Sequence, residues 1–387
     1  MPSSTVNGAG SNGASVQIPV INLSYDPSNP DASALQLVTA LRPDWAEPGA
    51  KVEFKRFTDG ITNTLLKSVN KREGESKEDI DNEAVLLRAY GNGTDVLIDR
   101  QRETQNHELL MQHGLAPELL ARFSNGMMYR YLRGTVTTPK DLRGATGSKN
   151  GTSSNDMVAP NKPPPNVWTV MQKWLHALPH ETEAERSRQE SLQKEFHWII
   201  EELSQRPSLG EYGLVFAHCD LLSGNVIIEP KAAGSSDTEE SVAFIDYEYA
   251  TPSPAAFDLA NHFAEWGGFD CDFTVLPTRT ERREFIAEYI KTYFAQLPNK
   301  PADVDVDSEI DKMCGEVDAF RGLPGFYWGI WALIQATISQ IEFNYAEYAE
   351  IRLGEYWAWK AEHTGQRKKN GGDLPVREKR WAEEEKA

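Results

Sequence analysis

A short polar motif enclosed by two apolar runs places the strongest constraint on how this chain folds. The motif is His218–Asn225 (HCDLLSGN), and it follows the pattern H-x-D-L-x-x-x-N. The apolar runs at 214–217 (LVFA) and 226–228 (VII) predict two short strands, so the motif is expected to be the tight loop between them. Further along, 242–245 (VAFI) predicts another strand, and this strand ends at Asp246.

The residue types in these segments suit phosphoryl transfer. Such a reaction needs a carboxylate that takes or orients the acceptor hydroxyl, and Asp220 is the candidate. Asn225 and Asp246 offer the oxygen ligands that Mg²⁺ prefers. Glu248 is expected either to orient a water on a second Mg²⁺ or to brace the loop. A lone H-x-D arises often by chance, but this combination between apolar runs predicts a kinase-like phosphotransferase site.

Composition excludes several other classes of function. The chain has 387 residues, of which 40% are hydrophobic, and this is enough for a large core and for two lobes. Its net charge of −18 disfavours nucleic acid as a partner, because nucleic-acid binding needs a basic surface. No apolar run approaches the length of a membrane span, so no membrane insertion is expected. The three widely spaced cysteines form no disulfide framework, which fits a soluble protein of the reducing cytoplasm.

The order of predicted elements is that of an α+β protein. A small β-rich region comes first, with strands expected near 52–57, 61–69, 84–90, 117–123 and 127–132 and helices at 33–41 and 99–113; the stretch 70–82 is expected to be turn-like. A larger, mainly helical region follows. The sequence predicts a disordered tail (1–15), a nucleotide-binding lobe (16–142), a flexible Gly-, Ser- and Pro-rich insertion (143–166), a catalytic and substrate lobe (167–365) and a charged tail (366–387).

Several blocks of sequence together resemble the choline/ethanolamine kinase family, and within it the ethanolamine kinases of fungal type. The blocks are FTDGITN at 57–63, LLRAYG at 86–91, the loop 218–225, FIDYEY at 244–249 running on to FDLANHF at 257–263, and a looser one from Trp328 to Phe343. The resemblance implies the two-lobed protein-kinase-like fold, with ATP and Mg²⁺ as cofactors. It implies transfer of the γ-phosphoryl group to ethanolamine, giving phosphoethanolamine for phosphatidylethanolamine synthesis. The family also suggests a homodimer, which the residues themselves leave open.

The resemblance assigns further roles on the nucleotide side of the site. Arg88 takes the place of the phosphate-binding lysine of a protein kinase, and Glu103 is its proposed partner. A turn of backbone N–H groups and hydroxyls replaces a glycine-rich loop over the phosphates. The cofactor-binding residues expected in this turn are Asp59, Gly60, Thr62 and Asn63. Cys219 departs from the family, whose members commonly carry Asn there, and a buried inert thiol is expected.

The acceptor pocket is expected around Glu265, Trp328, Trp331 and Tyr348. Aromatic residues at helical spacing more often form core than a cation site, and it is the resemblance that reverses this reading. A carboxylate suits a primary ammonium, which has three N–H donors, whereas a quaternary ammonium has none and prefers aromatic faces. Ethanolamine is therefore favoured over choline. Choline kinase or a dual-specificity enzyme is the alternative, and a catalytically silent binding module of the same fold is a more distant one.

Overall fold

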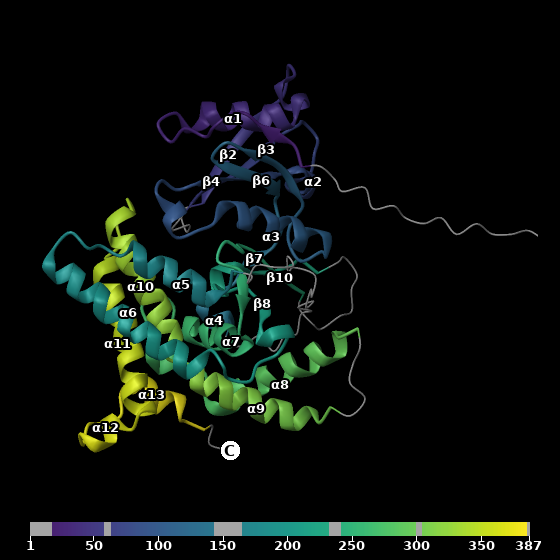
Figure 1. Ribbon diagram of the computed structural model, residues 1–387. Coiled ribbons are helices and arrows are strands. Elements are labelled where there is room, and N and C mark those ends of the chain that lie inside the picture. The colour runs from purple at the N-terminus through teal and green to yellow at the C-terminus, as the bar shows by residue number, and fades with distance from the viewer. Residues whose placement is uncertain (1–17, 58–62, 143–164, 232–240, 299–303, 385–387) are drawn as a thin grey trace, which may run out of the picture. The chain divides into compact units, whose positions relative to one another are not determined.

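The computed structural model describes residues 18–57, 63–142, 165–231, 241–298 and 304–384. The predicted disordered tail, most of the insertion 143–166, and the turn residues Asp59, Gly60 and Thr62 lie outside the described residues. By its contacts the chain divides into two compact units (Figure 1). The smaller unit comprises 1–58, 64–89 and 118–131, and the larger one comprises 59–63, 90–117 and 132–387.

The smaller unit contains a six-stranded sheet of order β1-β5-β6-β4-β3-β2. Its elements are β1 (Val20–Ile21), α1 (Pro30–Leu41), β2 (Val52–Phe57), β3 (Asn63–Asn70), α2 (Lys77–Glu83), β4 (Val85–Tyr90), β5 (Leu119–Phe123) and β6 (Gly126–Arg130). Leu37 and Val38 of α1 pack with Leu87, Ala121 and Met128 of the sheet in one apolar cluster. The predicted strands and the first helix are confirmed.

Helix α2 was not expected, because the stretch 70–82 carries no apolar periodicity. The helix begins at a capping box in which the Ser76 hydroxyl accepts from the backbone N–H of Asp79 and the Asp79 carboxylate accepts from Ser76. None of its residues is buried. Local capping thus forms this helix without the apolar face that a sequence pattern would reveal.

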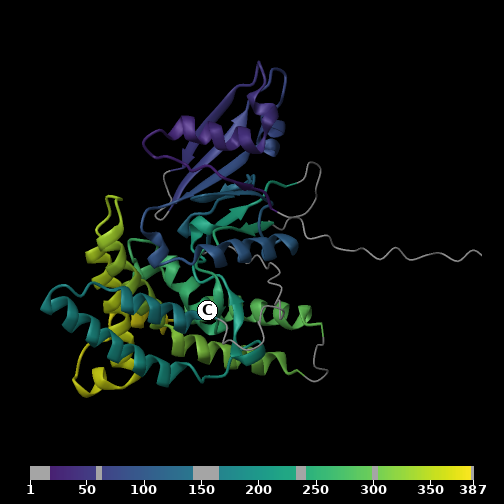
Figure 2. The same cartoon turned by 45° about the horizontal axis from the view of Figure 1, so that its top comes forward.

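The larger unit is mainly helical. Its helices are α3 (Arg100–Gln112), α4 (Pro139–Leu142), α5 (Val167–Ala177), α6 (Glu183–Leu203), α7 (Ala255–Ala264), α8 (Arg279–Gln296), α9 (Val306–Phe320), α10 (Leu323–Ile338), α11 (Tyr345–His363), α12 (Gln366–Lys369) and α13 (Val376–Trp381). Its short strands are β7 (Thr135–Val136), β8 (Val215–Ala217), β9 (Val226–Ile228), β10 (Val242–Phe244) and β11 (Thr251–Ser253). They form two small sheets, β10-β9-β7 and β11-β8, among the helices (Figure 2). No helix in the described part of the chain is long and apolar enough to cross a membrane.

The compact units divide the chain differently from the predicted boundary at residue 142, because α3 belongs to the larger unit. The Asn106 side chain donates to the backbone carbonyl of Ala250 at 2.9 Å. Tyr247 donates through its hydroxyl to the carbonyl of Leu115, just beyond the helix, at 3.1 Å. Both contacts join α3 to the segment that follows β10.

The C-terminal region also differs from the expected charged tail. α13 buries Arg377, Glu378 and Trp381, each with at most 4% of its surface exposed. The Trp381 ring lies against Phe263, with centroids 6.5 Å apart, and under the guanidinium of Arg282 at 3.9 Å. Two charged residues of α13, Arg377 and Glu378, are therefore buried and paired with each other, which the sequence pattern did not reveal.

Glycines in α10 set the spacing between α10 and α11. A Cβ at Gly325 would lie 2.5 Å from the backbone oxygen of Arg352, and one at Gly329 would lie 2.6 Å from Leu353. Real Cβ atoms do not approach neighbours so closely, so these two backbones are in contact only because a side chain is absent. α10 and α11 carry the aromatic residues of the predicted acceptor pocket. This close contact at Gly325 and Gly329, called the glycine seam below, therefore fixes the distance between the two helices that form the pocket.

This seam predicts opposite effects for two Gly→Ala substitutions. Gly325→Ala is expected to destabilise the protein by about 1–3 kcal/mol, because the obstructing atom is backbone and cannot rotate away. Gly354→Ala, on the exposed face of α11, meets nothing within 4 Å and is expected to stabilise by about 0.5–1 kcal/mol. Denaturant unfolding of both variants measures the difference, and equal stabilities would contradict the close contact.

Candidate active site

The loop between β8 and β9 is fixed by the carboxylate of Asp258 on α7. Its two oxygens accept from the backbone N–H groups of His218 at 3.1 Å and Cys219 at 2.8 Å. Cys219 has φ 61°, in the left-handed region that residues other than glycine rarely adopt. The Cys219 thiol is buried and burial raises its pKa well above the usual value, as an inert thiol requires.

Two neighbours of Asp258 on α7 also hold the loop, and sequence reasoning assigned them no role. The side-chain amide of Asn261 donates to the carbonyl of Cys219 at 3.0 Å. The Nδ1 atom of His262 lies 2.8 Å from the carbonyl of Leu221. Both residues were visible in the block 257–263, but nothing in its pattern indicates that their side chains point toward loop carbonyls.

Asp220 and Asn225 lie together in this loop and are buried. The Asn225 amide nitrogen lies 2.8 Å from the backbone oxygen of Asp220 and 3.3 Å from its carboxylate Oδ2. The loop thus orients both functional groups by contact between them. Because the amide nitrogen faces Asp220, the amide oxygen is the atom of Asn225 that suits a hard cation.

Asp246 is brought to the same place by the pairing of β9 with β10. Val226 is opposite Phe244, and the Ile245 N–H donates to the Asn225 carbonyl at 3.0 Å. The Nε2 atom of His218 lies 3.0 Å from the Ile245 carbonyl oxygen, so this ring also contacts the segment that follows β10. Asp246 itself has φ 65°. The two predicted segments therefore meet through the backbone of neighbouring strands.

The pKa of Asp220 is raised well above its usual value. Burial is the main cause, followed by the negative charges of Asp246, Glu265 and Glu248. Three carboxylates thus add their negative charge around Asp220. Such a cluster is stable when a cation accompanies it, which is the electrostatic setting of a metal-nucleotide site.

Glu248 is held by Asn63 and Arg100. Its Oε2 atom accepts from the Asn63 amide at 3.0 Å and from Arg100 at 3.1 Å. The same arginine pairs with Glu103 at 2.9 Å. Arg100 was missed because one arginine in a charged helix start carries no signal of its own. These contacts favour the bracing role among the two that the sequence left open for Glu248.

Arg88 lies on β4 of the smaller unit, opposite Met127 of β6. Its pairing with Glu103 and its contact with phosphates remain predictions.

The indole rings of Trp328 and Trp331 are buried and lie edge to face, with centroids 5.4 Å apart. Trp328 donates through Nε1 to Asn261 at 2.8 Å, and Trp331 donates to the Tyr249 hydroxyl at 2.8 Å. Asn261 therefore connects the aromatic cluster directly to the loop of Asp220. The predicted spacing on one helix face is borne out by these contacts.

Tyr348 and Glu265 both lie near a buried arginine, Arg352. The guanidinium lies 5.7 Å from the Tyr348 ring centroid and donates to Glu265 Oε1 at 3.3 Å. Burial raises the pKa of Glu265, and the charge of Arg352 opposes that rise. Arg352 was not expected, because it is distant in sequence from Glu265 and has no motif around it.

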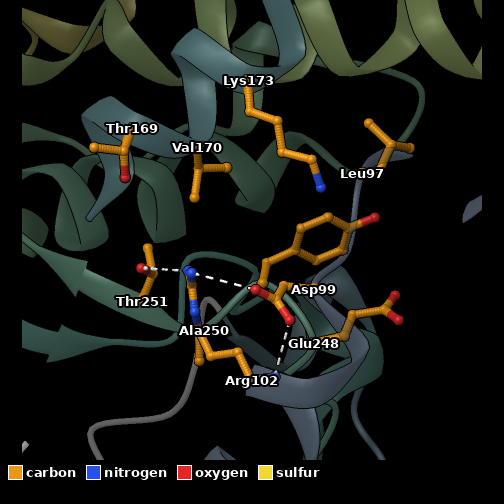
Figure 3. Close-up of a pocket in the computed structure, with 10 residues that line it drawn as sticks. Leu97, Asp99, Arg102, Thr169, Val170, Lys173, Glu248, Ala250 and Thr251 are labelled. Atoms are coloured by element: carbon orange, nitrogen blue, oxygen red, sulfur yellow. Dashed lines mark hydrogen bonds and ion pairs between the residues drawn. The ribbon is translucent and has the colours of Figure 1, made fainter. Parts of the chain in front are cut away.

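A cavity of about 90 Å³ lies beside Glu248, as Figure 3 shows. Arg102, on its wall, contacts Asp99 and Thr251, each at 3.5 Å. Lys173 extends from α5 toward it and donates to the backbone carbonyl of Asp95 at 3.0 Å. Small-molecule sites usually enclose roughly 300–1,000 Å³, so this cavity is too small for a nucleotide.

Comparison with known proteins shows which family this sequence matches. The family model for choline/ethanolamine kinase matches residues 54–357. An ethanolamine kinase of Mus musculus is 33% identical, over 86% of this chain and 90% of its own length. A probable ethanolamine kinase of Arabidopsis thaliana is 32% identical over 83% of each chain.

Solved structures show the same fold. An ethanolamine kinase of Plasmodium vivax matches 86% of this chain with a TM-score of 0.65 and 23% identity. A choline kinase of Cryptosporidium parvum matches 86% with a TM-score of 0.61 and 20% identity. The protein-kinase-like α+β fold predicted from the sequence is confirmed, and the chain belongs to the choline/ethanolamine kinase family.

Proposed function

We propose that this protein transfers the γ-phosphoryl group of ATP to the hydroxyl of ethanolamine, giving phosphoethanolamine. One observation carries the proposal most strongly. Asn261 hydrogen-bonds both the loop that carries Asp220 and the indole of Trp328, so the group that would receive the hydroxyl proton lies beside a buried aromatic cluster. A small amino alcohol needs this combination, because its hydroxyl and its ammonium are only two carbons apart.

Asp220 would orient the acceptor hydroxyl and take its proton. Its raised pKa makes it a stronger base than an exposed carboxylate, which assists proton removal from an alcohol. Because phosphoryl transfer passes through a loose transition state, holding the oxygen in line is expected to matter more than basicity. The neighbouring Asn225 keeps the carboxylate oriented.

The donor set fits Mg²⁺. Asn225 and Asp246 would hold the ion with oxygen atoms, and in such sites Mg²⁺ takes one or two protein ligands and completes its shell with phosphates and water. When bound, the ion neutralises charge on the phosphates. Glu248, fixed by Arg100, would brace the segment that presents Asp246.

The nucleotide would be aligned by Arg88 and Glu103, together with the turn that contains Asp59, Gly60, Thr62 and Asn63. A guanidinium can form a fork of two hydrogen bonds to phosphate oxygens. The contact of Asn63 with Glu248 supports a connection between this turn and the acidic residues.

Ethanolamine is proposed over choline because Glu265 offers a carboxylate to a primary ammonium. Trp328, Trp331 and Tyr348 would enclose the cation with aromatic faces. Arg352 forms an ion pair with Glu265 and so neutralises part of the negative charge that this carboxylate presents to the substrate. Choline kinase or dual specificity is the alternative, since relatives of both kinds share the fold.

A substrate comparison tests this choice. With saturating Mg-ATP, kcat/KM for ethanolamine is expected to exceed that for choline by at least about tenfold, because a hydrogen-bonding site discriminates against an ammonium group that has no N–H donor. Coupled ADP release gives the rates, and ³¹P NMR identifies the product. Equal values would contradict the ethanolamine assignment. Absence of any phosphorylated alcohol would favour the silent binding module instead.

The proposed product is the entry compound for phosphatidylethanolamine synthesis, and a cytoplasmic location and a homodimer complete the proposal.

A further inference from the structure

A buried chain of alternating charges leads from the proposed substrate pocket to the C-terminal helix α13. It contains three glutamates and three arginines, in the order Glu265, Arg352, Glu355, Arg377, Glu378 and Arg321. Five of the six have side chains at most 5% exposed, and Arg321 is 14% exposed. Charged groups are rarely buried without partners, so each member of this chain depends on its neighbours.

Glu355 is the link between the substrate side and α13. Its carboxylate lies 3.3 Å from Nε of Arg352 and 3.2 Å from Nε of Arg377. Arg352 in turn lies 3.3 Å from Glu265. Each of the two arginines is thus shared, and Glu355 divides its charge between them.

The outer end anchors Arg377 firmly. Arg377 pairs with Glu378 at 3.1 Å, and it also donates to the backbone carbonyl of Arg321. Glu378 pairs with the Arg321 side chain at 2.7 Å. Arg377 is therefore anchored by Glu378 within α13 and by Arg321, the residue that follows α9.

The two ion pairs at Glu355 differ in kind from the pair at Glu265. Arg352 donates to Glu265 in an aligned hydrogen bond, whereas the Nε–H groups of Arg352 and Arg377 are not aligned with Glu355 as hydrogen bonds. Charge, more than bond direction, therefore holds Glu355 between the arginines. The place of Arg352 between its two carboxylates then depends on how much of the Glu355 charge Arg377 neutralises.

We propose that Arg377 is a positioning residue for the acceptor substrate: by balancing Glu355 it keeps Arg352 shared, and so keeps Glu265 placed and charged toward the substrate ammonium. This inference rests on the proposed function. Arg377 does not touch the substrate. Its effect reaches the substrate through Glu355, Arg352 and Glu265, and no step of this route includes the loop of Asp220.

Kinetics of the full-length protein test the proposal. Arg377→Met leaves Glu355 with Arg352 alone and draws that guanidinium away from Glu265. Glu265 then loses the hydrogen bond that holds its carboxylate in place, and KM for ethanolamine is expected to rise about tenfold or more, the value of a charge-assisted hydrogen bond. kcat at saturating ethanolamine and KM for ATP are expected to stay within about twofold, because the phosphoryl-transfer groups are unchanged. Arg377→Lys retains the charge and is expected to restore most of the affinity for ethanolamine.

Lys379→Met is the matched control. It removes the same charge from the same helix at an exposed position and is expected to leave every kinetic constant unchanged. If Arg377→Met does not fold, the double variant Glu355→Gln with Arg377→Met removes one charge of each sign. Arg352 then has Glu265 as its carboxylate partner and competes with the ammonium, so KM for ethanolamine is again expected to rise.

The outcomes are separable. Unchanged KM for ethanolamine in these variants, with or without a lower Tm, would overturn the positioning role and leave the proposed function intact. An equal change in KM for ethanolamine and in KM for ATP would also overturn it, because the effect would not be confined to binding of the ammonium group. Failure of the unmodified protein to phosphorylate ethanolamine would instead refute the proposed function itself.

Discussion

Replacement of Asp220 by asparagine is expected to lower kcat by about three orders of magnitude, the range seen when a positioned acid-base group is lost. Asparagine retains the shape and a hydrogen-bonding oxygen, but it cannot accept the hydroxyl proton. KM for ATP is expected to remain nearly unchanged, because Asp220 is assigned to the acceptor. Steady-state rates with Mg-ATP measure the effect, and near-native turnover would remove Asp220 from the mechanism.

The same variant is expected to be at least as stable as the unmodified protein without metal or nucleotide. Burial and three neighbouring carboxylates raise the pKa of Asp220, so the folded state binds the proton more tightly than the unfolded state does. The stability linked to this proton is fully present below the unfolded-state pKa of about 4 and is lost as pH rises through the higher folded-state pKa. At pH 8, above the unfolded-state pKa, the titratable carboxyl group of Asp220 therefore lowers the stability, and asparagine avoids this cost.

Thermal unfolding at pH 8 in EDTA tests this point, with Asp311→Asn as the control. Asp311 is exposed and paired with Arg283, and it undergoes the same chemical change away from the site. A clearly lower Tm for Asp220→Asn would show that the loss of activity comes from a damaged fold. An equal or higher Tm together with the low kcat would assign the effect to chemistry.

Replacement of Asp246 by asparagine is the second change with a large expected effect. We expect kcat/KM to fall by about 10²–10³-fold, because the amide is a neutral and weaker ligand than the carboxylate for the ion that stabilises the transferring phosphate. The Mg²⁺ concentration for half-maximal activity is expected to rise. Titration of activity with Mg²⁺ at fixed ATP measures both quantities.

Asparagine is the right substitute here because of the backbone. Asp246 has φ 65°, a conformation that asparagine adopts more readily than most residues. Alanine would add backbone strain to the loss of the ligand and would confuse the two effects. An unchanged Mg²⁺ requirement in Asp246→Asn would contradict the role as a metal ligand.

The catalytic loop was predictable because its information is local. His218, Asp220 and Asn225 occupy one turn between two apolar runs, and strand pairing carries Asp246 to them. The aromatic pair Trp328 and Trp331 was predictable for a similar reason, since helical spacing fixes their common face. In both cases a short segment determines the geometry.

The buried ion pairs were not predictable, because they join residues far apart in the chain. Arg352 meets Glu265, and Arg377 meets Glu355, through helix packing that has no sequence signature. In the sequence, α13 resembles a solvated charged tail. Its one visible hint is Trp381, an aromatic residue whose position among charges indicates a segment that packs against the fold.

The glycine seam between α10 and α11 has a consequence for substrate range. Trp328 and Trp331 lie on α10, and Tyr348 and Arg352 lie on α11. The backbones of these two helices are already in contact at Gly325, and this contact sets the width of the proposed substrate pocket. Close-packed main chains compress and separate only at high energy. We therefore expect that a bulkier amino alcohol is accommodated by replacing an aromatic side chain of the pocket with a smaller one, and not by separation of α10 from α11.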